Sequence, residues 1–77
     1  MIVEIITPDA EIFSGNASSV KFPGLDGLFE ILDNHAPMVA ALKKGEIKLL
    51  SEEETLFFDI NGGVVEVLKN KVQVLAE

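Results

Sequence analysis

Turn-forming residues recur at short intervals along this chain, and their spacing constrains the fold more than any other feature of the sequence. Pro, Gly, Asn and Asp interrupt the chain too often to leave room for most helices. Between the turns lie segments of about four to seven residues that are rich in Val, Ile and Phe, as β-strands are. These segments are 2–7, 10–13, 17–22, 27–32, 38–43, 46–50, 55–60, 63–68 and 71–76. The spacing predicts an all-β sandwich or barrel.

In two of these segments apolar and polar residues alternate, which predicts which face of the strand is turned toward the core. Val20 and Phe22 alternate with polar neighbours, and the segment 71–76 follows the same pattern. The segments 55–60 and 63–68 are instead apolar on both sides. Strands of this second kind are either covered on both faces or contact a partner.

One segment could start a helix. Ser51 stands three residues before Glu54, the pattern of a helix-capping box, and apolar residues follow. The continuation 55–60 is β-branched and aromatic, which suits a strand better. We therefore predict a charged hairpin tip at 51–54, and a short helix is the alternative.

Length and composition indicate a single small domain over residues 1–77 that is completed by a partner. A chain of 77 residues buries only about 60% of the surface its unfolded form exposes. It has no Cys and one His, so disulfides are excluded and a structural metal is poorly supported. At 48% hydrophobic residues it should fold and leave some apolar side chains outside its core.

The charge of the chain and its lack of targeting signals limit which partners and which cellular location are possible. Thirteen acidic residues against six basic ones give a net charge of −7, which repels nucleic acid and other phosphate-rich partners. The chain has no basic, apolar leader at its N-terminus, and no apolar stretch approaches the roughly 18 residues of a spanning helix. We therefore expect the protein to stay inside the cell.

Catalysis has little support in the sequence. His35 is the one residue able to act as an acid or base at neutral pH, and a small metal-dependent enzyme would pair it with Asp33. No second His, no Cys and no recognisable ligand spacing accompany it, so His35 is interpreted as shaping a loop or an interface. The segment 23–27 lacks the Lys and the helix of a phosphate-binding loop, and no cofactor is expected.

Three stretches, taken in order, resemble the epsilon subunit of F-type ATP synthases. The first is Thr7-Pro8 with Glu11-Ile12-Phe13-Ser14-Gly15. The second is Pro23-Gly24 through Gly27-Leu28-Phe29-Glu30-Ile31-Leu32 to His35-Ala36-Pro37-Met38, with Ala41-Leu42-Lys43 and Gly45. The third is Asn61-Gly62-Gly63-Val64-Val65-Glu66-Val67 with Asn70-Lys71-Val72-Gln73-Val74-Leu75-Ala76. Together they span nearly the whole chain.

The resemblance implies a flattened β-sandwich of two sheets with about ten short strands. It implies a non-catalytic rotor subunit in the central stalk, which binds the gamma subunit and the polar loops of the c-ring and helps to couple proton or sodium flow to ATP synthesis. Such a subunit would lie at the cytoplasmic face of the bacterial inner membrane, held there through the complex. The chain stops at Glu77, before the inhibitory C-terminal helical hairpin of most relatives, so the resemblance implies a rotor subunit without that arm. The alternative is an unrelated small all-β carrier or binding domain, with a modified Lys44, Lys69 or Lys71.

The resemblance also places two contact loops. The ring-facing loop falls on Leu28, Phe29, Glu30 and Ile31, and the loop near gamma falls on His35, Ala36, Pro37 and Met38. Leu28, Phe29 and Met38 are large apolar groups of the kind that anchors an interface, although Phe29 could equally belong to the core. Many relatives have an acidic residue at the position of Leu28 and Gly at that of Glu30, so we expect the ring-facing contact to differ in this chain.

Overall fold

The computed structural model describes residues 1–77 and consists of seven β-strands joined by short turns. It contains no helix, and therefore none long and apolar enough to cross a membrane. The strands are β1 (Ile2–Ile6), β2 (Glu11–Asn16), β3 (Ser19–Gly24), β4 (Gly27–Leu32), β5 (Met38–Leu50), β6 (Thr55–Leu68) and β7 (Lys71–Ala76). The all-β prediction is confirmed.

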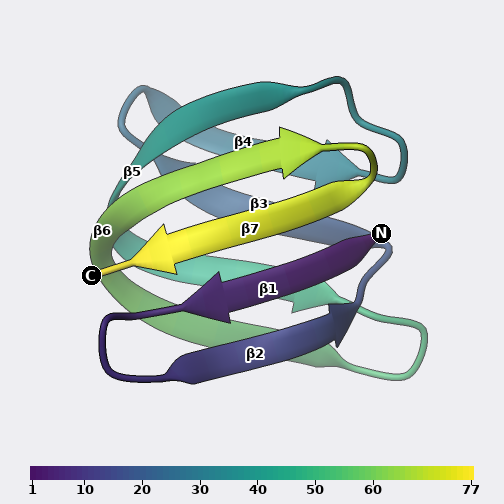
Figure 1. The fold of residues 1–77 in the computed structure, drawn as a ribbon, viewed down its shortest axis with the longest axis horizontal. Helices are drawn as coiled ribbons and strands as arrows, with labels where there is room; N and C mark the ends of the chain where they lie inside the picture. Colours follow the sequence, from purple (N-terminus) through teal and green to yellow (C-terminus); the bar gives the residue numbers. More distant parts are fainter.

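All seven strands belong to one hydrogen-bonded sheet in the order β2-β1-β7-β6-β5-β3-β4. The sheet folds over on itself, because β6 passes from the far layer to the near layer at the left of the view in Figure 1, with β3 and β4 behind and β7, β1 and β2 in front. Neighbouring strands are antiparallel except β1 and β7, which are parallel. The strands β2 and β4 form the two edges.

The prediction of about ten short strands in two sheets was wrong in its count. The segments 38–43 and 46–50 are one strand, β5, and the segments 55–60 and 63–68 are one strand, β6. The sequence suggested a turn within each strand, at Lys44-Gly45 in the first and at Asn61-Gly62-Gly63 in the second. In the structure β5 and β6 stay paired in one unbroken register through this region, with only Lys44 and Asn61 left out of the ladder. The glycines bend the two strands without ending them.

The core lies between the two layers. Val20 and Phe22 point inward from one layer and Val72 and Val74 from the other, and all four are fully buried, as alternation predicted. In β6 the side chains of Phe57, Val64 and Leu68 are exposed on the outer faces. The strands that are apolar on both sides are therefore covered on one side only, which leaves the other side open to a partner.

The segment 51–54 forms the tip of the β5–β6 hairpin, as predicted, and the helix alternative is wrong. The Ser51 amide donates a hydrogen bond to the Glu54 carbonyl at 2.9 Å. The Ser51 hydroxyl accepts a hydrogen bond from the Glu54 amide at 3.3 Å and donates one to the Glu54 carbonyl at 3.1 Å. The same residues that suggest a capping box here close a four-residue turn.

Candidate partner-binding surface

The first predicted contact segment, residues 28–31, lies within the edge strand β4, as the apolar segment 27–32 predicted, and not in the loop that the resemblance implied. Side chains in a strand alternate between its two faces, so this segment cannot present all four residues to one partner. Leu28 and Glu30 point outward, and Leu28 is 80% exposed. Ile31 points inward and is 0% exposed, so its side chain is part of the core and unable to contact a partner in this structure.

Phe29 is partly buried and belongs to the inward-facing set. Its ring stacks on the fully buried ring of Phe22 on β3, with centroids 5.4 Å apart and planes at 28°. The two residues are direct partners in the β3–β4 register. Phe29 therefore packs against the core, which was the alternative prediction for it, although its burial is incomplete.

The second predicted segment, residues 35–38, comprises the end of the connection from β4 to β5 and the first residue of β5, Met38. Its backbone is fixed at the start by a hydrogen bond from the His35 amide to the Leu32 carbonyl at 3.2 Å. His35 Nδ1 lies 2.6 Å from the Ala36 carbonyl oxygen, so Nδ1 carries a proton and donates to that oxygen. Ala36 and Pro37 are exposed, whereas Met38 is partly buried and packs against the core. His35 thus shapes the loop, and Ala36 and Pro37 form its outer surface.

Two further contacts hold the start of this loop. The N-terminal ammonium of Met1 donates to Asp33 Oδ1 at 2.6 Å and to the Ala17 carbonyl at 3.1 Å. The Asn34 amide donates to Asn70 Oδ1 at 2.8 Å, and Asn34 adopts the left-handed conformation with φ of 61°. The ammonium beside Asp33 lowers the pKa of that carboxyl, first through the hydrogen bond and second through its charge. No feature of the sequence indicated this pair, because its two partners are 32 residues apart.

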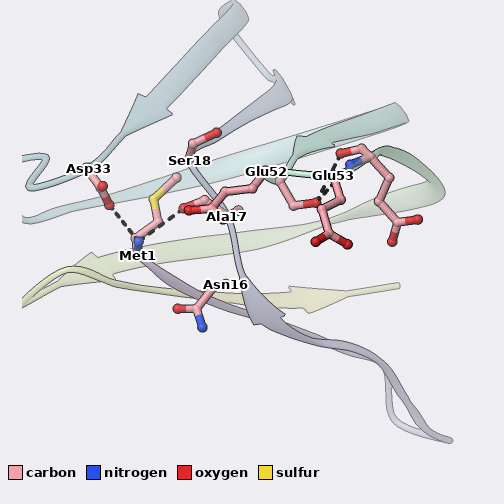
Figure 2. Close-up of a pocket in the computed structure, with 9 residues that line it drawn as sticks. Met1, Asn16, Ala17, Ser18, Asp33, Glu52 and Glu53 are labelled. Atoms are coloured by element: carbon pink, nitrogen blue, oxygen red, sulfur yellow. Dashed lines mark hydrogen bonds and ion pairs between the residues drawn. The ribbon is translucent and has the colours of Figure 1, made fainter.

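The same end of the molecule carries an open, acidic hollow. Figure 2 shows the Met1 ammonium between Asp33 and Ala17, with the acidic hairpin tip of Glu52 and Glu53 farther along. The hollow is about 510 Å³ in volume. No three His, Asp or Glu side chains in residues 1–77 are grouped so that they could hold a metal ion, and Asp33 is engaged with Met1 instead of His35.

Leu28 and the second predicted contact segment lie toward opposite ends of β4. Leu28 is near its beginning and His35 follows its end, so the four residue steps from Leu28 to Leu32 alone separate them by about 13 Å at the usual rise of a strand. They do not form one patch. Any partner that contacts both must extend along the edge of the sheet, or two partners must divide them.

Several exposed apolar residues escaped the analysis of the sequence as site residues. On the outer face of the layer formed by β4, β3 and the adjoining halves of β5 and β6, these are Leu32, Leu50 and Phe57. The alternation of outward and inward side chains could have identified them, since Leu32 and Leu50 each follow a buried residue and Phe57 stands between two partly buried ones. They lie on the same face as Leu28 and Glu30.

Comparison with known proteins gives a consistent match. Residues 1–77 match the family described as ATP synthase, Delta/Epsilon chain, beta-sandwich domain. The chain is 49% identical over 76 residues to the ATP synthase epsilon chain of Chlorobium limicola, and the match covers 97% of this chain and 86% of that protein. It is 38% identical over 86 residues to the ATP synthase epsilon chain of Salinibacter ruber, with 100% of this chain and 58% of that protein covered.

Two solved structures share the fold. One is a chain of the mitochondrial ATP synthase central stalk and c-ring of Tetrahymena thermophila, with a TM-score of 0.84, 18% identity, and coverage of 97% of this chain and 61% of that chain. The other is a chain of the mitochondrial ATP synthase of Euglena gracilis, with a TM-score of 0.92, 19% identity, and coverage of 99% of this chain and 49% of that chain. At these identities the likeness concerns the fold.

Proposed function

Because this chain belongs to the delta/epsilon chain family of ATP synthases, we propose that it is a non-catalytic subunit of the central stalk that binds the gamma subunit and the c-ring. Its contribution would be mechanical. It would turn with gamma and the ring and help to couple ion flow to ATP synthesis. Every functional site on it would then be a contact site.

The observation that carries this proposal is the amount of large apolar surface outside a complete core. The core itself is closed, with side chains such as Ile31 and Val65 fully buried. Even so, eleven large hydrophobic side chains are exposed, and Leu28 is the most exposed of them. Exposed apolar side chains that gather on one face, as Leu32, Leu50 and Phe57 do, mark surfaces that other polypeptides cover.

We place the two contacts on the residues that the structure leaves accessible. Leu28 and Glu30, on the outward side of β4, would face the polar loops of the ring. Ala36 and Pro37 would face gamma, with His35 holding the loop in shape. Pro37 stiffens this loop because its ring fixes φ and biases the residue before it toward an extended conformation.

The same proposal includes the two-sheet sandwich architecture and the location of the chain in the cell. The two layers of the folded sheet would correspond to the two sheets of a flattened sandwich, packed face to face. The chain would be held at the cytoplasmic face of the bacterial inner membrane through its partners.

The experiment is assembly of purified protein with gamma and with the c-ring of the same organism. Leu28→Asp should weaken binding to the ring by about tenfold or more, since an interface anchor contributes more than about 1.4 kcal/mol. Ala36→Arg should weaken binding to gamma in the same way. Ile12→Asp, on the opposite edge strand β2, is the matched control because Ile12 is also exposed.

Melting curves of each variant separate loss of binding from loss of folding. Met38 is unsuitable for this test because its side chain packs against the core. Normal assembly of both Leu28→Asp and Ala36→Arg would show that the contact sites are misplaced, and failure of the unaltered protein to bind either partner would overturn the proposed function.

A further inference from the structure

Two lysines face each other on the outer side of the layer that contains β4. The strand register places Glu30, Lys21, Lys48 and Phe57 in one row across β4, β3, β5 and β6. All four side chains are exposed, and the residues on either side of each lysine along its strand point into the core or toward it. Lys21 and Lys48 therefore project side by side from the same face.

This arrangement does not help the isolated chain to fold. Like charges directly opposite one another on neighbouring strands repel and destabilise the pair. The one ion pair in the structure joins Met1 to Asp33, so neither lysine ammonium is in direct contact with a carboxylate, not even that of Glu30 across from Lys21. The chain has 13 acidic residues and only 6 basic ones, so two adjacent lysines without an ion-pair partner are unexpected.

Apolar side chains border the lysine pair along the next row and at one end of its own row, while the acidic residues Glu30, Glu46 and Asp59 border its remaining sides. The next row along the strands runs from Leu32 through Ser19 to Leu50, and Leu32 and Leu50 are 54% and 41% exposed. Phe57, beside Lys48 in its own row, is 55% exposed. We call these five residues, Lys21, Lys48, Leu32, Leu50 and Phe57, the lysine face.

We propose that the lysine face docks a segment of a partner protein that is apolar and carries a carboxylate, which would lie between the two ammonium groups. This inference rests on the proposed function, and it specifies the chemistry of one partner contact. The apolar residues of the segment would cover Leu32, Leu50 and Phe57. The carboxylate would relieve the repulsion between Lys21 and Lys48, so binding would supply the pairing that the free chain lacks.

An anionic lipid surface or a nucleic acid fits the same lysines less well. Both present extended arrays of phosphates, and the chain carries a net charge of −7. Glu30 lies in the lysine row itself, and Glu46 and Asp59 are exposed on the same outer side of β5 and β6. These acids would repel an array of phosphates, whereas a single carboxylate can be seated between two lysines.

The test compares two double charge reversals. Lys21→Glu with Lys48→Glu alters the lysine face, and Lys44→Glu with Lys71→Glu makes the same change in net charge at the bend of β5 and on the opposite outer face. All four lysines are exposed, so both variants should fold, which melting curves verify. The probe is the purified assembly of gamma and c-ring lacking this chain.

Reversal at the lysine face should weaken binding by about tenfold or more, and the control pair should change it by less than about twofold. Treatment of the assembled complex with a zero-length carbodiimide, which joins a lysine amine to a carboxylate in contact with it, should yield cross-linked peptides that contain Lys21 or Lys48.

Three results would overturn the inference. If the unaltered chain binds and reversal at the lysine face leaves its affinity within twofold, the inference fails and the proposed function stands. If the unaltered chain does not bind the assembly, the proposed function fails and the inference with it. If the unaltered chain binds vesicles containing phosphatidylglycerol and the reversal abolishes this binding, the face is a lipid site instead.

Discussion

Replacing Gly63 by Ala should destabilise the fold far more than replacing Gly27 by Ala. Both glycines have positive φ, at +147° and +127°, so an L-residue at either position strains the backbone, at a cost of about 1–3 kcal/mol. They differ in what a side chain would meet. A Cβ at Gly63 would lie 2.3 Å from the Leu75 carbonyl oxygen, whereas nothing lies within 4 Å of one at Gly27.

The additional cost at Gly63 follows from this geometry. Leu75 is on β7, and the contact atom belongs to the backbone, so relief requires β6 and β7 to move apart next to the Gly63 and Ala76 pair. Losing one or two backbone hydrogen bonds there adds about 1–3 kcal/mol. A chain of 77 residues has a total stability of about 4–12 kcal/mol, so Gly63→Ala removes a large part of it.

Urea unfolding followed by circular dichroism measures the difference directly. Gly63→Ala should be less stable than Gly27→Ala by about 2 kcal/mol, equivalent to a melting temperature about 8–16 °C lower. Equal stability of the two variants would refute the argument that close approach of β7 requires glycine at the bend of β6.

Two other predictions concern the fold around the contact residues. Ile31→Ala should reduce the free energy of unfolding by about 2–5 kcal/mol because the side chain is fully buried, while Leu28→Ala should change it by less than about 0.5 kcal/mol; the same urea titrations test this, and equal effects would contradict the assignment of Ile31 to the core. The lowered pKa of Asp33 in the folded state means that its contribution to stability is present above the ordinary carboxyl pKa and is lost as pH falls through the lowered value. Asp33→Asn should therefore lose stability at pH 7 and lose less of it on acidification, as urea midpoints from pH 7 to pH 2 would report; an unchanged pH profile would show that the Met1 pair does not form in solution.

The alternation of apolar and polar residues and the spacing of turns predicted most of the fold, because both patterns are determined by residues close together in the sequence. Val20 and Phe22 were placed in the core correctly, and the hairpin tip at 51–54 was placed correctly against a competing helix pattern. The number of strands was wrong because glycine can bend a strand as well as end one, and only the pairing partner decides which occurs.

The candidate site was predicted less completely, for a related reason. The segment 27–32 was correctly predicted as a strand, but the resemblance placed residues 28–31 in a contact loop, and the alternation that buries Ile31 was not applied to them. The pairing of Met1 with Asp33 and the pairing of Lys21 with Lys48 depend on tertiary register, which brings together residues 32 and 27 positions apart. No local pattern contains that information.

Hydrogen exchange of the chain, alone and bound to the assembly of gamma and c-ring, tests the central claim most directly. In the free chain the amides along the open side of the edge strand β4 should exchange rapidly, since only β3 pairs with this strand. On binding, residues 27–37 should become protected while the other edge strand, β2, stays unchanged. Protection confined to β2, with β4 exchanging as in the free chain, would contradict the account.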